Sequence, residues 1–276
     1  MTVDFPVQSL PTDVQPVVSA RVIAITNQKG GVGKTTTAVN LGAAIAGHGH
    51  RVLLLDLDPQ ANASSGVGAS MASVEGTTYD VLVRDRQIEE IVRPTDIAGL
   101  DVAPAHPELA AAEVELVGTE SRETALRERL RALRSTYGYV LIDCPPSLGL
   151  LTLNALVASD SVIIPLQCEY FALEGITHLL DTIRRVKEHL NSRLEIEGIL
   201  LTMFDGRLNL SMQVAEEARR HFGGRVYKTM IPRNVRLGEA PSFGKPVRAY
   251  DPGCIGAVSY DNLAREILDH DEACAR

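Results

Sequence analysis

The sequence has little cysteine and no long hydrophobic segment. Its four cysteines, Cys144, Cys168, Cys254 and Cys274, are widely spaced and include no C-x-x-C pair, so they indicate neither a disulfide framework nor a zinc site, and we expect free thiols. No apolar run approaches the length of a membrane span, and no basic region followed by a hydrophobic segment opens the chain. These absences favour a cytoplasmic protein without a membrane span.

The first residues lack the pattern of a folded element. Residues 2–20 contain three prolines, no basic residue and no sustained hydrophobic period, so we expect a flexible tail over residues 1–20. This tail either docks a partner or, as its composition favours, has no role visible in the sequence. The whole chain of 276 residues is 45% hydrophobic, which is enough for a large core, and we expect one domain over residues 21–276.

A glycine-rich segment follows the first apolar stretch. Residues 22–25 are apolar without alternation, which is typical of a strand buried on both faces of a parallel sheet. Gly30, Gly31 and Gly33 then allow successive N–H groups to turn inward around an anion. A helical pattern begins at Thr35, so the free N–H groups and dipole of that helix point at the same anion. The segment predicts a phosphate-binding loop.

The polar side chains of this loop fit a nucleotide. Lys34 is placed to neutralise β- and γ-phosphate oxygens, and the Thr35 hydroxyl is placed to bind Mg²⁺. The strict pattern G-x-x-x-x-G-K-[ST] requires glycine at position 28, where this chain has Gln28, and a second lysine, Lys29, stands at the entrance to the loop. The predicted loop residues are Lys29, Gly30, Gly31, Val32, Gly33, Lys34, Thr35 and Thr36.

Two further apolar strands end in aspartates. The stretch RVLLLDLDPQ, residues 51–60, delivers Asp56 and Asp58, and YVLID ends at Asp143. Ligands of open α/β sheets bind beyond the carboxyl ends of the strands, so these carboxylates should lie near the phosphates. Asp143 has the Walker B arrangement, in which a carboxylate holds Mg²⁺ through water. The two prolines that follow restrict the backbone, and we predict a switch over residues 143–149.

Strands and helices alternate along the rest of the chain. Strands are expected at residues 100–103, 161–165 and 196–203, and helices within 108–133, over 173–190, over 210–222 and over 255–273. Residues 62–98 predict a switch-like loop followed by short helices. This alternation predicts an α/β fold with a mostly parallel, doubly wound sheet and helices on both faces.

Charge is unevenly distributed. Residues 203–248 hold nine Lys and Arg against four acids, a net of +5, although the whole chain carries −8. Such a stretch can bind a phosphate backbone or can be a solvated face, and charge alone does not decide between them. Residues 259–276 are net acidic, so anionic lipid would repel this end of the chain.

These motifs together resemble a known family. The variant loop K-G-G-V-G-K-T-T, the segments D-L-D-P-Q and D-C-P-P-S, and the stretches F-D-G-R-L-N-L-S and I-P-R-N-V-R-L-G-E-A-P-S-F-G-K-P-V are similar to those of ParA/Soj DNA-partition ATPases. These are P-loop NTPases with a deviant Walker A motif, related to MinD and to nitrogenase iron protein. The resemblance implies Mg²⁺-dependent ATP hydrolysis within an ATP-dependent homodimer that sandwiches two nucleotides.

The resemblance also implies roles for single residues. Lys29 would reach the partner subunit's phosphates, and Asp58 would position or activate the attacking water. Asp56 would support the Mg²⁺ shell, although a strand-end carboxylate that caps the next turn is an equal alternative. Pro232 and Asn234 would contact adenine, and Arg207 and Arg236 would bind double-stranded DNA without sequence preference. A ParB-type protein would stimulate hydrolysis on the nucleoid.

Other functions fit parts of the same pattern. A related ATPase could position a different cargo, and the sequence does not exclude this. A MinD-like membrane regulator would need a basic amphipathic terminal helix, which residues 259–276 do not provide. An electron-transfer ATPase would need an iron–sulfur cluster shared between subunits, for which Cys144 is a candidate, but buried packing also explains this cysteine and is favoured.

Overall fold

A seven-stranded sheet forms the centre of the computed structural model, which describes residues 19–69, 75–169 and 175–275. Its strand order is β3-β4-β2-β5-β1-β6-β7. The strands are β1 (Arg21–Ile25), β2 (Val52–Asp56), β3 (Arg93–Pro94), β4 (Leu100–Ala103), β5 (Tyr139–Asp143), β6 (Ser161–Gln167) and β7 (Glu195–Thr202). All pairs are parallel except β3 with β4, where a two-residue edge strand runs antiparallel.

Helices connect these strands. The α-helices are α1 (Lys34–Gly47), α2 (Asn62–Gly66), α3 (Thr78–Val83), α4 (Ile88–Ile91), α5 (Leu109–Glu115), α6 (Ala125–Leu130), α7 (Leu150–Ala158), α8 (Ile176–His189), α9 (Asn209–Phe222), α10 (Val235–Glu239), α11 (Val247–Tyr250) and α12 (Ile255–Ala275). The 3₁₀ helices within the described residues are η2 (Leu116–Gly118), η3 (Arg131–Ser135), η4 (Gly223–Arg225) and η5 (Ala240–Phe243).

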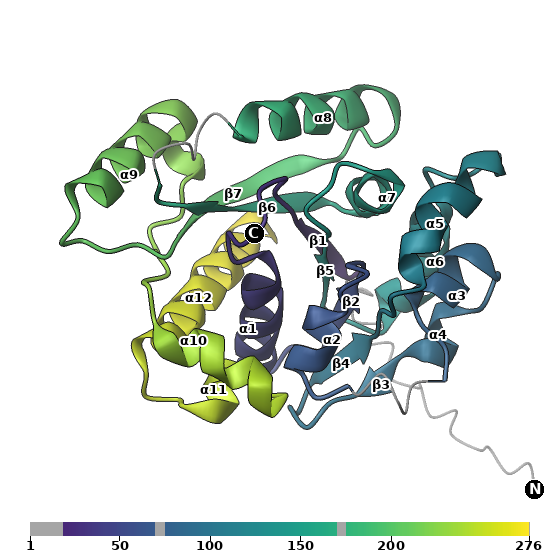
Figure 1. Ribbon diagram of the computed structural model, residues 1–276, viewed down its shortest axis with the longest axis horizontal. Coiled ribbons are helices and arrows are strands. Elements are labelled where there is room, and N and C mark those ends of the chain that lie inside the picture. The colour runs from purple at the N-terminus through teal and green to yellow at the C-terminus, as the bar shows by residue number, and fades with distance from the viewer. Residues whose placement is uncertain (1–18, 70–74, 170–174, 276) are drawn as a thin grey trace, which may run out of the picture.

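Each central strand is buried on both faces. Along β1, Val22 and Ala24 belong to one apolar cluster, whereas Ile23 and Ile25 belong to another. Figure 1 shows α7, α8 and α9 on one side of the sheet and α1 and α12 on the other. Because successive side chains of a strand point to opposite faces, this two-sided cover needs the unbroken apolar runs seen in the sequence.

The structure confirms the predicted architecture and corrects some boundaries. The strands at 100–103 and 139–143 lie where they were expected, and β6 extends two residues beyond its predicted end at Pro165. Sequence reasoning missed α7, α10, α11 and β3. The predicted tail ends before Ala20, which is buried in the core and donates its N–H to the Arg134 carbonyl of η3 at 2.7 Å. The rest of the predicted tail, residues 1–18, lies outside the described residues.

No helix in the described part of the chain is long and apolar enough to cross a membrane.

One glycine of β7 lets an aromatic ring pack directly on the sheet. A Cβ atom added at Gly198 would lie 2.5 Å from the buried Tyr227 ring. We therefore expect Gly198→Ala to lower the free energy of unfolding by about 1 to 3 kcal/mol, because the ring or the strand must shift. Urea denaturation measures this change. Gly224→Ala is the control, since no atom lies within 4 Å of its added Cβ, and an equal loss in both variants would contradict the packing argument.

Candidate functional site

The glycine-rich loop joins β1 to α1 at the carboxyl edge of the sheet. Gly31 and Gly33 have φ angles of +75° and +89°, in the left-handed region that side chains disfavour. Gly33 is the residue before α1, and a Cβ there would face the Thr202 side chain at 3.7 Å. The free N–H groups of the first turn of α1 therefore open toward the loop, as anion binding requires.

The two loop lysines lie differently. Lys34 is buried, and its Nζ donates to the Lys29 carbonyl oxygen at 3.1 Å. Burial lowers the pKa of Lys34, while Asp143 and Asp58 oppose that shift by stabilising its positive charge. Lys29 is exposed instead, and its Nζ lies 3.2 Å from Oε2 of Glu169. The structure thus places Lys34 inside its own loop and points Lys29 away from it.

Two of the predicted aspartates are neighbours across the sheet. Asp56 ends β2 and Asp143 ends β5, and the two residues are register partners. Both side chains are fully buried. Burial is the main cause that raises the pKa of Asp56 to about 6, and burial followed by the Asp56 charge raises the pKa of Asp143 well above its usual range. The sheet register therefore concentrates negative charge beside the phosphate loop.

Asp56 is satisfied by the protein. Its Oδ2 accepts from the N–H and the hydroxyl of Ser64, at 2.8 and 2.7 Å, and its Oδ1 accepts from the Asp58 N–H at 3.0 Å. Ser64 Oγ also accepts from the Ala105 N–H at 3.0 Å. These contacts are those of the turn-capping alternative, because Asp56 organises residues 58–64. A part in the Mg²⁺ shell stays a prediction for Asp56.

Asp143 is not satisfied. Within the described residues neither of its buried carboxylate oxygens makes a hydrogen bond of normal geometry, although the Thr35 hydroxyl is close enough to lower its pKa in part. A buried carboxylate without partners is costly unless a cation or donor accompanies it. A hydroxyl and a carboxylate are oxygen ligands of the kind that Mg²⁺ prefers. The residues present therefore fit Mg²⁺ at Thr35 and Asp143.

Asp58 lies beyond the end of β2, near both the loop and the carboxylate pair. It is largely buried, and its Oδ1 accepts from the Gln60 N–H at 3.0 Å. Its charge acts on Lys34 and on Asp143. Asp58 thus lies in the same electrostatic group as the residues predicted to bind phosphate and metal, which is the position that a water-orienting carboxylate would need.

A cavity of about 480 Å³ opens beside the loop. Gly33 and Thr36 line it together with Pro232 and Asn234. Its other lining residues are Thr202, Met203, Ile231, Arg233, Val235, Leu237, Gly238, Glu239 and Tyr260. Mostly apolar lining with a few polar groups is typical of a nucleoside pocket. The structure brings both residues predicted to contact adenine into one cavity with the phosphate loop.

Several residues that hold this site together gave no sequence signal. Thr202 donates its hydroxyl to the Val32 carbonyl at 2.8 Å, and Asn27 donates to the Pro165 carbonyl at 2.7 Å. Asn40 of α1 accepts from the Val247 N–H at 2.7 Å. Each bond joins the loop or its helix to a segment more than a hundred residues away, so no local pattern marks these residues.

The two arginines predicted to bind DNA emerge from adjoining segments. Backbone bonds join Phe204 to residues 231–233, which connects the loop that carries Arg207 to the segment that leads into Arg236. Arg207 makes two bonds to Asp205, at 2.9 and 2.6 Å, and these lower the pKa of the Asp205 carboxyl to about 2. Arg236 pairs with Glu239 at 2.7 Å and with Asp251 at 3.2 Å. Both guanidinium groups therefore already contact acids of their own chain.

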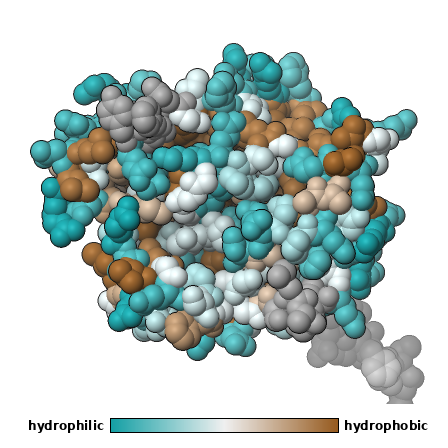
Figure 2. All heavy atoms as spheres, in the orientation of Figure 1, coloured by the Kyte–Doolittle hydropathy of each residue, from teal (hydrophilic) through white to brown (hydrophobic). Residues whose placement is uncertain are grey.

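Other cations of residues 203–248 are exposed without an ion pair in the described part of the chain: Arg219, Arg220, Arg225, Lys228, Arg233 and Lys245. Apolar side chains accompany them, because Leu208, Met212 and Val235 are about half exposed or more. Figure 2 shows this mixture of hydrophilic and hydrophobic surface over α9 and α10. The basic stretch is thus a mixed surface.

Cys144 lies in the apolar core. It is fully buried, and burial raises the pKa of its thiol. This burial fits a packing role for Cys144.

Comparison with known proteins agrees with this geometry. A family described as "AAA domain" matches residues 20–196. The chain is 60% identical over 247 residues to the sporulation initiation inhibitor protein Soj of Bacillus subtilis, covering 90% of this chain and 98% of that protein. It is 56% identical over 251 residues to the chromosome partitioning protein ParA of Myxococcus xanthus, covering 91% and 89%.

A solved structure shows the same fold with ligands. Cobyrinic acid a,c-diamide synthase from Mycobacterium smegmatis, described with a bound ATP analogue and magnesium, is 37% identical and superposes with a TM-score of 0.81, covering 92% of this chain and 96% of that one. The phosphate loop, the strand-end carboxylates and the identity to Soj and ParA lead to one conclusion: the chain belongs to the ParA/Soj family of P-loop partition ATPases.

Proposed function

We propose that the protein is an ATP-dependent DNA-partition switch. The observation that carries this proposal is the convergence of Lys34, Thr35, Asp58 and Asp143 at one edge of the sheet, next to a nucleoside-sized cavity. The similarity to proteins named for chromosome partitioning supports the biological role.

Binding of ATP uses the loop and the cavity. The N–H groups at the start of α1 and the Lys34 ammonium neutralise the phosphates, so Lys34 exchanges the Lys29 carbonyl for a charged acceptor. The adenine ring enters the cavity lined by Pro232 and Asn234. Mg²⁺, when bound, supplies charge neutralisation at the β- and γ-phosphates. Thr35 and Asp143 would hold it, and Asp56 would support that shell by keeping the turn over residues 58–64 in place.

Hydrolysis requires a water oriented in line with the γ-phosphate. Asp58 is the residue we assign to that role, because it lies beyond β2 among the groups that face the phosphate. Lys29 would complete the site of the partner subunit in a nucleotide-sandwiched homodimer. Its exposure and its salt bridge with Glu169, away from its own loop, support an action in trans.

DNA binding would follow from dimerisation. Joining two copies of the surface around Arg207 and Arg236 doubles the number of phosphate contacts and raises affinity without any base readout. Exposed ion pairs contribute little to stability, so a phosphate can replace Asp205 or Glu239 as the arginine's acceptor. A ParB-type protein would stimulate hydrolysis, and loss of the γ-phosphate would relax the switches and release the nucleoid DNA.

The DNA contacts can be tested with charge reversal. We expect binding to random-sequence duplex DNA with ATP, but not with ADP or without nucleotide. Arg207→Glu plus Arg236→Glu should weaken it by at least about tenfold while nucleotide binding persists, because phosphate contacts are lost. Fluorescence anisotropy at several salt concentrations measures both effects.

The control is Arg131→Glu plus Arg184→Glu, which makes the same charge change at exposed, ion-paired arginines outside the basic stretch. If wild-type protein binds no DNA in any nucleotide state, the cargo is something other than DNA, as in the alternative of a related ATPase that positions another cargo.

Mixed dimers test the action of Lys29 in trans. Lys29→Gln and Asp58→Ala should each abolish most ATPase activity. An equimolar mixture should recover roughly a quarter of the wild-type rate, because half of randomly paired dimers are mixed and each holds one complete site. A steady-state phosphate-release assay measures this. Mixing Lys29→Gln with the double variant Lys29→Gln plus Asp58→Ala is the control, and recovery there, or none in the first mixture, would refute the assignment.

The buried carboxylates predict a pH dependence of the metal-free protein. The folded-state pKa of Asp56, about 6, lies above its ordinary value of 3.8, so the folded protein binds this proton more tightly than the unfolded chain. The stability that the protonated Asp56 carboxyl contributes is fully present below about pH 4, and it is lost as the pH rises through 6 toward 7. Over this range wild-type stability should fall by on the order of 2 kcal/mol more than that of Asp56→Asn. Urea denaturation at several pH values tests this, with Asp96→Asn as an exposed control, and parallel curves for wild type and Asp56→Asn would contradict it.

A further inference from the structure

Helix α5 and η2 present an apolar pair that the protein itself does not cover. Val114 is 75% exposed and Val117 is 55% exposed. Leu109, Ala112 and Leu116 of the same segment are buried in the core, so the segment is amphipathic with two valines on its outer side. Figure 2 shows hydrophobic surface beside hydrophilic surface where α5 lies in Figure 1. Single exposed apolar residues are ordinary, so the surroundings of this pair decide whether it forms a binding surface.

The surroundings are acidic. Residues 108–123 contain five glutamates and a single arginine, Arg122, a net of −4. A segment that carries apolar side chains between lysines or arginines would complement this surface in both charge and hydrophobicity. Charge complementarity would steer that segment to α5, and burial of the valines would hold it there.

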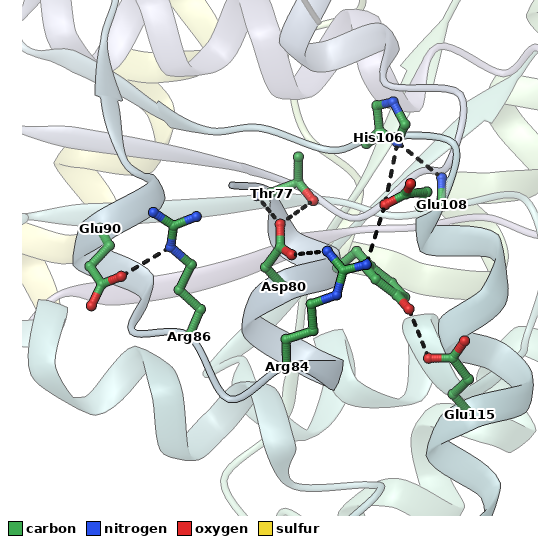
Figure 3. Close-up of polar contacts among 9 residues, drawn as sticks. Thr77, Asp80, Arg84, Arg86, Glu90, His106, Glu108 and Glu115 are labelled. Atoms are coloured by element: carbon green, nitrogen blue, oxygen red, sulfur yellow. Dashed lines mark hydrogen bonds and ion pairs between the residues drawn. The ribbon is translucent and has the colours of Figure 1, made fainter. Parts of the chain in front are cut away.

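The segment is fixed to its neighbours at several points. Tyr79 of α3 donates its hydroxyl to Oε2 of Glu115 at 2.9 Å. Arg84 is the residue that follows α3, and Figure 3 shows its side chain between Asp80 and Glu108. Its guanidinium nitrogens lie 2.7 Å from a carboxylate oxygen of Asp80 and 4.0 Å from one of Glu108. Because α5 is bonded to its neighbours at these points, a shift of α5 on partner binding would also move the elements that it contacts.

The most consequential of these contacts is with the start of α7. Glu113 accepts from the N–H groups of Leu150 at 2.7 Å and Leu151 at 3.3 Å. A carboxylate in this position satisfies two free N–H groups of a helix N-terminus and complements its dipole. The cap occupies the space where a side chain at Gly149 would be, since an added Cβ would lie 2.3 Å from Glu113 Oε1.

This cap adjoins the predicted switch. Residues 143–149 lead directly into α7, and Thr152 in its first turn donates to the Ser147 carbonyl at 2.6 Å. A continuous path of contacts thus runs from the exposed valines, through Glu113 and the α7 N-terminus, to the loop that begins at Asp143.

We propose that Val114 and Val117, within the acidic surface of residues 108–123, form the docking site for a basic, apolar segment of the hydrolysis-stimulating partner, and that Glu113 transmits docking to the switch. Glu113 is a positioning residue in this scheme, because it acts through α7 and not on the nucleotide. The inference rests on the proposed function, since it assumes a partner that accelerates hydrolysis.

The test compares ATPase acceleration by a purified ParB-type protein across variants. Val114→Ala plus Val117→Ala should raise the half-maximal concentration of that protein by about tenfold, with basal ATPase activity and ATP-dependent DNA binding unchanged. Alanine favours helix, so the fold is not threatened. The matched control is Ile255→Ala plus Val258→Ala, an exposed apolar pair with the same spacing on α12, which should behave as wild type.

A second variant separates docking from transmission. Glu113→Gln keeps one acceptor oxygen and loses the charge, so it should lower the maximal acceleration severalfold while leaving the half-maximal concentration unchanged. If the valine double variant has the wild-type half-maximal concentration of the ParB-type protein, the docking site is wrong. If Glu113→Gln reaches the wild-type maximal acceleration, the transmission through Glu113 is wrong. If no ParB-type protein accelerates the wild type, the proposed function itself fails, and the docking site fails with it.

Discussion

The juxtaposition of Asp56 and Asp143 is the constraint on which the rest of the site depends. Parallel strands in register bring equivalent ends together about 5 Å apart, and here both ends carry a buried carboxylate. Two such charges in a medium of low polarity repel each other and lose their hydration. The fold offsets this cost for Asp56 with bonds from Ser64 and Asp58, whereas Asp143 accepts no hydrogen bond of normal geometry within the described residues. A cation bound next to Thr35 would relieve the remaining cost.

The same constraint explains why the ligands must bind together. Asp143 and Asp58 stabilise the positive charge of Lys34, yet its ammonium contacts a loop carbonyl. If Lys34 moves onto a phosphate, the carboxylates lose part of that compensation, so a metal ion bound with the nucleotide keeps the charges balanced. On the proposed function, binding of one ligand would thereby favour binding of the other, which is coupling in the thermodynamic sense.

Local patterns were sufficient for the elements that meet at this edge. β1, β2 and β5 are short apolar runs, and each is followed by or ends in a recognisable residue type: glycines after β1, aspartates at the ends of β2 and β5. Because ligands bind beyond the ends of parallel strands, these glycines and aspartates could be predicted to lie together. The framework around them could not be predicted. Thr202 and Asn40 each make a single hydrogen bond to a segment distant in the sequence. Threonine and asparagine are common residue types, so the sequence does not indicate this role. Helix α7 was missed because its mostly apolar sequence, LLTLNALVA, lacks an amphipathic period.

The charge of the chain adds a last condition. A protein with a net charge of −8 is repelled by DNA at long range, and its arginines at 207 and 236 are partly neutralised by Asp205, Glu239 and Asp251. One subunit therefore offers a basic surface that is too weakly charged to hold DNA firmly. In the proposed dimer, two such surfaces would add their contacts at little further entropic cost. In the proposed switch, Asp205, Glu239 and Asp251 would make DNA binding depend on the oligomeric state. They would keep a single subunit off DNA, and phosphates would replace them as acceptors when a dimer presents both surfaces at once.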